Sequence, residues 1–383
     1  MEAMSEAQSI TQKGMTNSKE NGMTAAIMTI FDIYNYGNRL QNYAVQYVLN
    51  QMQLETVTFV SDSERISQVQ KIKYFLQKIT KYHLPGSVPY WKYSLPKCLK
   101  FEGFNRRYIK VKRFQSIGRI DRGIDYFIVG SDQVWNPLWY DSESCKKDRY
   151  LLTFTEKRKK ICFSPSFGLT ELPEEWKPWF KEHLLGFENL SVRETAGAKI
   201  IKELTGQEAE VLIDPTLMLS KDEWMEIARQ PVQIGSQKKY AFAFFLGGMS
   251  DTVKKDIVLL VQRHGYMILD VLDMSRPEYM SDPSEFLYLL ANAEMILTDS
   301  FHGCVFSFIF DKPFWVYDRI EGMDMNSRME TFLRKFDLEG RKRNQAEAID
   351  DFTVDYSKGK SILCIEREKV IAFLKKSMQG AQD

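Results

Sequence analysis

Short apolar runs recur along the chain, and most of them are followed by residues with helical periodicity. The predicted strands cover residues 25–31, 56–60, 126–129, 160–164, 190–192, 211–213, 240–246, 266–271, 294–298 and 314–317. After the first strand, apolar residues return at i, i+3, i+4, i+7 and i+8 (Leu40, Tyr43, Ala44, Tyr47 and Val48), which predicts an amphipathic helix. Because strands that are apolar on both faces alternate with helices, the pattern predicts an α/β fold with parallel sheets covered by helices.

The second half of the chain repeats this alternation. Residues 251–264 carry an apolar helical face, residues 282–285 are typical of a helix start, and a last helix is predicted over about residues 361–378. That last helix is long enough to pack across both halves. A chain of 383 residues favours two domains. We therefore predict a flexible segment at 1–22, an N-terminal domain at 23–200 and a C-terminal domain at 201–383.

Composition narrows the class of protein. The hydrophobic content of 44% favours packed cores, and a net charge of +1 gives no general reason to expect nucleic-acid binding. The five cysteines are scattered and form no CxxC pair, which favours reduced thiols and argues against a zinc site. The chain shows neither an apolar leader nor a run of membrane-spanning length, so we expect a cytoplasmic protein.

One stretch departs from the near balance of basic and acidic residues in the chain. Between residues 68 and 113 the chain has twelve Lys or Arg and a single acidic residue, Glu102, interleaved with aromatic residues. It is expected to be an insertion in the N-terminal domain with a solvated basic face. The alternative is a surface for an anionic acceptor, or for peripheral contact with the inner face of the membrane.

Several polar clusters follow predicted strands, where a parallel sheet gathers the carboxyl ends of its strands at one edge. They contain Asn35, Gly37, Asn38 and Arg39; Ser131, Asp132, Trp135 and Asn136; Arg193 and Glu194; Asp214; Gly247 and Gly248; and Ser300 and His302. His302 is placed to begin a helix, where free N–H groups attract anions and an imidazole can supply a proton near neutral pH. The combination indicates transfer chemistry on a polar, anionic substrate.

Each cluster also has a purely structural interpretation. Residues 35–39 and 130–137 can be capped turns, the second with a core tryptophan, and Arg193 can form a surface ion pair with Glu194. Asp214 is expected to cap a turn rather than act as an acid. Residues 247–248 fit a flexible turn as well as a phosphate loop, and His302 alone fits a structural histidine.

Taken in order, four segments resemble the polysaccharide pyruvyl transferase family. They are residues 34–43 (YNYGNRLQNY), 129–136 (VGSDQVWN), 191–194 (SVRE) and 298–303 (TDSFHG). The turns at 164–168 (SPSFG) and 213–216 (IDPT) are similar to turns of the family as well. The resemblance implies two Rossmann-like domains in a GT-B-like arrangement with an interdomain cleft.

The resemblance also implies an activity, namely transfer of the enolpyruvyl group of phosphoenolpyruvate to a sugar. The product is a pyruvate ketal, with release of phosphate, in the synthesis of an exopolysaccharide, capsule or cell-wall glycan. By the family pattern, His302 matches the histidine of the phosphoenolpyruvate site, and Arg193 matches an arginine that holds the donor's anionic groups. We expect His302 to act as the general acid, Asp132 and Asn136 to orient acceptor hydroxyls, and Trp135 to stack on the sugar.

Two positions depart from the family pattern. Ser300 stands where many members have arginine, and Asn38 stands where many have aspartate. Arg39, Arg328 and Lys312 are the candidates to replace the missing cation.

The expected partners are phosphoenolpyruvate, as donor substrate, and a sugar or lipid-linked oligosaccharide acceptor, with no further cofactor. Two alternatives stay open. One is a nucleotide-sugar-dependent GT-B glycosyltransferase that binds its nucleotide near residues 247–248. The other is a catalytically silent carbohydrate-binding or assembly protein.

Overall fold

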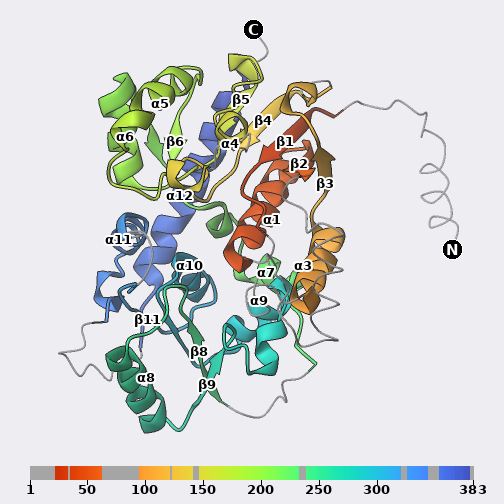
Figure 1. Cartoon of the computed structure of the whole chain (residues 1–383). Coiled ribbons are helices and arrows are strands. Elements are labelled where there is room, and N and C mark those ends of the chain that lie inside the picture. The colour runs from red at the N-terminus through yellow and green to blue at the C-terminus, as the bar shows by residue number, and fades with distance from the viewer. Residues whose placement is uncertain are drawn as a thin grey trace, which may run out of the picture.

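The computed structural model describes residues 22–32, 35–62, 95–120, 123–140, 146–232, 239–320, 326–343 and 353–379. The described part of the N-terminal half forms a parallel sheet of five strands in the order β3-β2-β1-β4-β5 (Figure 1). Its strands are β1 (Thr24–Met28), β2 (Glu55–Ser61), β3 (Val111–Phe114), β4 (Tyr126–Val129) and β5 (Lys160–Cys162). The central strands β1 and β4 pair in register from Ala25 opposite Tyr126 to Met28 opposite Val129.

In the middle of the chain a two-stranded sheet joins β6, at the end of the N-terminal half, to β7, and the C-terminal half contains a parallel sheet of four strands in the order β11-β10-β8-β9. These strands are β6 (Ser191–Val192), β7 (Glu210–Val211), β8 (Tyr240–Phe244), β9 (Met267–Asp270), β10 (Met295–Thr298) and β11 (Phe314–Val316). The parallel α/β fold and each of the predicted strands are confirmed. The edge strand β3 was not predicted, because its sequence VKRF lacks an apolar run and its first three residues are exposed.

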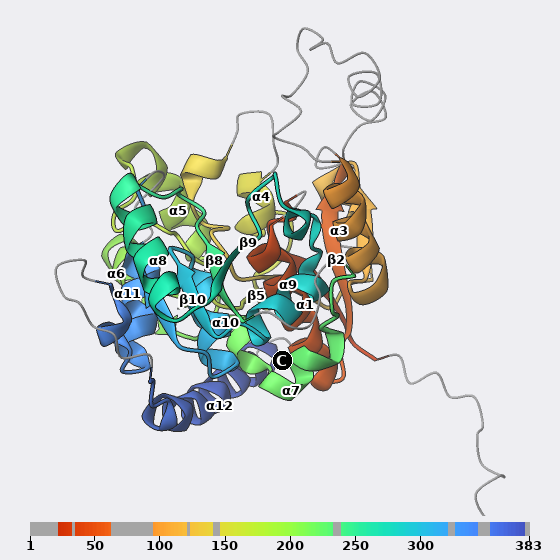
Figure 2. The same cartoon turned by 90° about the horizontal axis from the view of Figure 1, so that it is seen from below.

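The helices connect and cover these strands. They are α1 (Tyr36–Gln51), α3 (Leu95–Tyr108), α4 (Lys146–Tyr150), α5 (Lys177–Leu184), α6 (Thr195–Thr205), α7 (Lys221–Ile227), α8 (Asp251–Arg263), α9 (Pro283–Ala291), α10 (Phe301–Ile309), α11 (Asn326–Lys335) and α12 (Ser357–Gln379). Viewed from below, α3 and α8 lie on opposite sides of the molecule (Figure 2). Among the described residues, no helix combines the length and the apolar character needed to cross a membrane.

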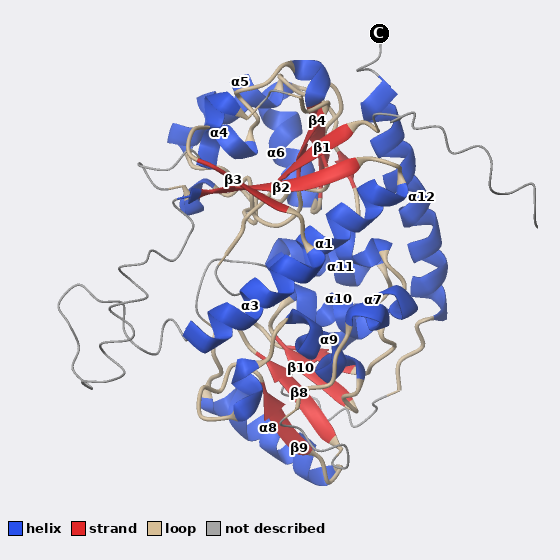
Figure 3. Ribbon diagram, turned by 90° about the vertical axis from the view of Figure 1, so that its right-hand side faces the viewer, coloured by secondary structure: helices blue, strands red, loops and turns tan. Residues whose placement is uncertain are grey.

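One apolar core runs between the two large sheets. It includes Ile27 of β1 and Phe242 of β8, together with buried side chains of α1, α9 and α10. These three helices lie between the two sheets (Figure 3). In this core, the ring of Tyr36 at the start of α1 stacks on Phe286 of α9, with ring centroids 4.3 Å apart. The start of α1 is thereby fixed against the C-terminal half, which holds the two halves in the GT-B-like arrangement that the resemblance implies.

The last helix, α12, touches both halves. The hydroxyl of Tyr126 on β4 donates to the carbonyl of Met378 at 3.2 Å, and Arg367 donates to the carbonyls of Leu217 and Leu219 at 2.8 Å each. Near the other end of the helix, Lys360 donates to the carbonyl of Ile309 in α10 at 3.2 Å. These contacts tie α12 to both halves along its length.

Only part of the predicted basic insertion lies within the described residues. The N-terminal segment 1–21 and residues 63–94 lie outside the described residues. The remainder of the stretch forms α3 and β3, and Lys100 of α3 forms an ion pair of 2.9 Å with Glu285 of α9. This part of the basic stretch therefore belongs to the packed fold, and contact with a membrane stays a prediction.

Candidate active site

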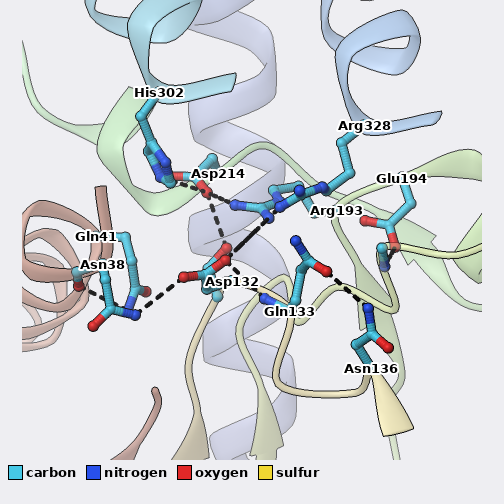
Figure 4. Close-up of polar contacts among 12 residues, drawn as sticks. Asn38, Gln41, Asp132, Gln133, Asn136, Arg193, Glu194, Asp214, His302 and Arg328 are labelled. Carbon is cyan, nitrogen blue, oxygen red and sulfur yellow. Dashed lines mark hydrogen bonds and ion pairs between the residues drawn. The ribbon is translucent and has the colours of Figure 1, made fainter. Parts of the chain in front are cut away.

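Asp214 lies in a polar cluster with Arg193, His302 and Asp132 (Figure 4). The residue is 1% exposed. Its carboxylate forms an ion pair with Arg193 and accepts hydrogen bonds from the Ser131 hydroxyl at 3.0 Å and from the Thr216 N–H and hydroxyl at 2.9 and 2.6 Å. Burial alone raises the pKa of this carboxyl, but Arg193, His302 and the Thr216 hydrogen bonds lower it to about 2. Asp214 therefore caps its turn, as expected, and is also a fixed negative charge in the site.

Asp132 is a second carboxylate of the cluster and has an unusual backbone. Its φ of 79° lies in the left-handed region, which costs free energy for a residue other than glycine. The Asn38 amide donates to Oδ2 at 3.0 Å, and the guanidiniums of Arg193 and Arg328 each lie 3.8 Å from Oδ1. Burial raises the pKa of Asp132, but the nearby Arg193, His302 and Arg328 lower it overall. Asp132 is thus placed to hold both arginines.

His302 occupies the first turn of α10, directly after β10, and is 9% exposed. One side of the imidazole lies against Gly37, where a Cβ would overlap Nδ1 and so displace the ring. On the other side, Nε2 is 3.9 Å from Oδ2 of Asp214 and has no hydrogen-bond partner among the described residues. Burial lowers the pKa of His302, and Arg193 and Arg328 lower it further against the opposing effect of Asp214 and Asp132. These surroundings therefore favour the neutral imidazole.

Two buried guanidiniums supply the positive charge of the site. Arg193 follows β6 and is 3% exposed, and Arg328 lies in α11 and is 2% exposed. Both lie over the ring of Phe301, with Cζ 4.6 and 6.0 Å from its centroid. Nε and Nη2 of Arg193 have no hydrogen-bond partner among the described residues. The arrangement suits an anion that brings several oxygen acceptors.

Glu194 does not form the surface ion pair that was one interpretation of its neighbour Arg193. Its side chain is fully buried, and Oε1 accepts from the N–H groups of Phe167 and Gly168 at 2.8 and 3.2 Å. It therefore fixes the turn at 164–168. Within the described part of the chain, no three His, Cys, Asp or Glu side chains gather in a way that could hold a metal ion.

Trp135 and Asn136 have structural roles. The expectations that Trp135 stacks on the sugar and that Asn136 orients acceptor hydroxyls are therefore wrong. Trp135 is fully buried against Phe167 and Phe187, so neither face of its ring is open to a sugar. Asn136 is also fully buried, and its side chain caps the following turn by accepting from the N–H of Leu138 at 3.1 Å. Neither side chain is placed to touch an acceptor, because both serve the core and the turn.

Other predicted site residues support the first turns of helices. Asn35 caps α1 by accepting from the N–H of Asn38 at 3.1 Å, and Ser300 caps α10 by accepting from the N–H of Gly303 at 3.5 Å. Arg39 donates to Oδ1 of Asn38 at 3.0 Å, which orients the Asn38 amide toward Asp132. These residues act through their neighbours and set the positions of His302 and Asp132.

The loop at 246–248 does not present its first N–H groups to a ligand. Leu246 and Gly247 donate to the two carboxylate oxygens of Asp299 at 2.7 Å each, and Arg319 lies 3.4 Å from the same carboxylate. The anion that this loop binds is therefore a side chain of the chain itself, which was not foreseen from the sequence.

The model of a family described as polysaccharide pyruvyl transferase matches residues 35–320, which is most of the chain. The chain belongs to the polysaccharide pyruvyl transferase family. The matched residues include Gly37, Asp132, Arg193, Asp214 and His302, whereas α11 with Arg328 follows them. No curated protein matches this pyruvyl transferase family member significantly in sequence.

Several solved structures are similar to this pyruvyl transferase family member. The UDP-GlcNAc 2-epimerase of Neisseria meningitidis bound to UDP-GlcNAc is 10% identical, with 92% of this chain and 100% of that chain covered and a TM-score of 0.44. The UDP-GlcNAc 2-epimerase of Methanocaldococcus jannaschii in complex with UDP-GlcNAc and UDP is 11% identical, with 90% and 98% covered and a TM-score of 0.39. The spinosyn rhamnosyltransferase SpnG is 9% identical, with 91% and 96% covered and a TM-score of 0.40.

Proposed function

We propose that this protein transfers the enolpyruvyl group of phosphoenolpyruvate to two hydroxyls of a sugar, forming a pyruvate ketal and releasing phosphate. The observation that carries the proposal is the meeting of His302 and Arg193 at Asp214, between the two sheets and within the residues that match the family. Phosphoenolpyruvate has a carboxylate and a phosphate, and buried guanidiniums are suited to both groups.

The chemistry assigns His302 the role of proton donor. The methylene carbon of the enol takes a proton from His302 while one sugar hydroxyl attacks the adjacent carbon and releases its own proton to solvent, from which His302 is protonated again. The second hydroxyl then forms the other C–O bond as the C–O bond to phosphate breaks, and phosphate leaves with the proton of that hydroxyl. The donor's negative charges raise the pKa of His302, so the imidazole becomes protonated when the donor is bound. Asp214, ionised at 3.9 Å from Nε2, stabilises the imidazolium.

For the acceptor, the structure favours Trp139 in place of Trp135. Trp139 is 48% exposed. Its indole N–H donates to Oε1 of Gln133, the residue after Asp132, at 3.1 Å, and this hydrogen bond holds the ring in place. An exposed, anchored indole gives a sugar ring an apolar face for stacking. The acceptor is a sugar of a glycan or of a lipid-linked oligosaccharide, and the proposal includes no cofactor.

The nucleotide-sugar alternative meets a specific obstacle. It requires N–H groups near residues 247–248 for a diphosphate, but Asp299 occupies those of Leu246 and Gly247. A diphosphate at that loop has to displace a carboxylate that is also paired with Arg319. The described geometry therefore favours an anionic donor at Arg193 over a nucleotide at this loop.

The decisive experiment incubates the purified chain with phosphoenolpyruvate and a panel of glycans and lipid-linked oligosaccharides. Phosphate release and a pyruvyl mass increment on one glycan, both lost in His302→Ala, are expected. Transfer of sugar from a UDP- or GDP-sugar without any pyruvyl product replaces the proposal with the glycosyltransferase alternative. Binding of glycans with neither reaction leaves the catalytically silent alternative.

A further inference from the structure

Arg193 and Arg328 form a pair of guanidiniums from separate parts of the chain. Arg193 follows β6 in the N-terminal half, and Arg328 is carried by α11 in the C-terminal half. Both are almost completely buried, both lie over Phe301, and both are 3.8 Å from the same Oδ1 of Asp132. Figure 4 shows the two side chains directed toward one another above Asp132.

This pairing is electrostatically costly as it stands. Burial lowers the pKa of Arg328 to about 9, and the positive charge of Arg193 contributes to the decrease. Asp214 is engaged by Arg193, so Asp132 is the carboxylate that the two guanidiniums share. Asp132 and Asp214 oppose the repulsion between the guanidiniums, and Nε and Nη2 of Arg193, which have no hydrogen-bond partner among the described residues, can donate to the oxygen atoms of a bound anion.

The two guanidiniums also border an opening in the protein. A pocket is lined by Arg193, Asp214, Phe301, Arg328 and Lys335, together with Thr331 and apolar side chains of the 212–217 turn and of α11. The Asp214 carboxylate is paired with Arg193. The pocket therefore has apolar side chains beside the guanidiniums of Arg193 and Arg328. Such a lining suits a small molecule that has both an anionic group and a short carbon skeleton.

We propose that Arg328 and Arg193 form a two-arginine site for an anionic group, phosphate or carboxylate, with Asp132 holding both guanidiniums in position. Identification of the anion as part of phosphoenolpyruvate rests on the function proposed above, but the site itself does not. Arg328 lies beyond residues 35–320, which match the family, so the match itself gives Arg328 no role, and the contacts described above carry the proposal.

The other candidate cations lie elsewhere. The guanidinium of Arg39 lies over the ring of Phe31, with Cζ 3.5 Å from the centroid, and is bonded to Asn38. Lys312 follows the far end of α10, a helix of nine residues, so roughly 13 Å of helix separate it from the turn of His302. Neither residue faces Asp132 together with Arg193, as Arg328 does.

The test measures binding of phosphoenolpyruvate and, separately, of inorganic phosphate by calorimetry to wild type, Arg328→Ala, Arg328→Lys and Arg334→Ala. Arg334 lies on the same helix and is exposed, so Arg334→Ala makes the same charge change away from the site. We expect Arg328→Ala to weaken phosphoenolpyruvate binding on the order of 10- to 100-fold. Arg328→Lys should recover only part of this loss, and Arg334→Ala should bind like wild type.

The outcomes separate this inference from the proposed function. Wild-type affinity for both probes in a folded Arg328→Ala variant overturns the two-arginine site, even if pyruvyl transfer is observed. If wild type transfers no pyruvyl group but binds inorganic phosphate in a manner that depends on Arg328, the site stands and the proposed donor is wrong. If Arg328→Ala does not fold, Arg328→Lys tests the site, because lysine keeps the positive charge but lacks the planar guanidinium. A partial loss of affinity in Arg328→Lys then supports the two-arginine site, and wild-type affinity overturns it.

Discussion

The imidazole of His302 lies against the backbone of Gly37, so that any side chain at position 37 would overlap its Nδ1. The two residues come from the two halves of the chain, Gly37 from the first turn of α1 and His302 from the first turn of α10. A glycine is therefore required at this position for the close approach of two helix N-termini. The relationship fixes His302 between α1 and Asp214.

Gly37→Ala is expected to displace the imidazole and to lower pyruvyl transfer about 10²-fold, because displacements of about 1 Å at a reacting group cost this much. Gly103→Ala is the matched control, since Gly103 is also helical and a Cβ there meets no atom within 4 Å. Activity is measured as pyruvyl product, and folding by thermal unfolding. Full activity in a folded Gly37→Ala variant would show that the position of His302 does not matter.

The protonation of His302 should depend on the donor. Burial and the two arginines lower its pKa in the described state, and a bound anion opposes this effect. In an NMR titration, the imidazole of His302 is expected to show a pKa below 6.5 without ligand and a higher pKa with phosphoenolpyruvate. The chain has four histidines, so His302→Gln identifies the signal. An unchanged pKa on saturation with phosphoenolpyruvate argues against His302 as the proton donor.

Asp214 should contribute to stability in a defined pH range. Its folded pKa of about 2 lies below the ordinary value of 3.8, so its contribution is complete above 3.8 and is lost as the pH falls toward 2. Asp214→Asn is expected to lower the free energy of unfolding by about 2–4 kcal/mol at pH 7, since Arg193 loses its main partner. Urea unfolding at pH 7 and pH 3 should show a smaller difference at pH 3.

The control for this prediction is Asp251→Asn, because the Asp251 side chain is 91% exposed at the start of α8. It should change stability by less than about 1 kcal/mol at either pH. A loss in Asp214→Asn that is the same at both pH values would contradict the shifted pKa as its cause.

Much of the fold could be predicted from periodicity, because parallel strands buried on both faces are continuous apolar runs. Strand β3 could not be predicted in this way, because it is an edge strand without an apolar run and its charged residues face solvent. The capping box at Asp282 and Glu285, which starts α9, was visible as a polar start before an apolar run. Local chemistry of this kind needs no knowledge of the tertiary structure.

The site was harder to predict, because its charges are set by contacts between distant segments. Asp214 could be recognised as a cap, but its ion pair with Arg193 joins residues 21 positions apart. Arg328 had no local motif, and an arginine on an amphipathic helix is usually exposed. Trp135 and Trp139 stand four positions apart in one polar turn, and sequence alone could not decide which of them is buried.

The two tryptophans give a test of the acceptor side. Trp135→Ala removes a fully buried indole that donates to the carbonyl of Tyr150 at 2.9 Å, and is expected to cost about 3–5 kcal/mol of stability. Trp139→Ala removes a half-exposed ring, so stability should change little while the KM for the acceptor rises several-fold and the KM for phosphoenolpyruvate stays constant. Leu138→Ala, at a neighbouring residue that is 50% exposed, is the control and should leave both KM values unchanged. Equal acceptor KM values in Trp139→Ala and wild type would remove Trp139 from the acceptor site.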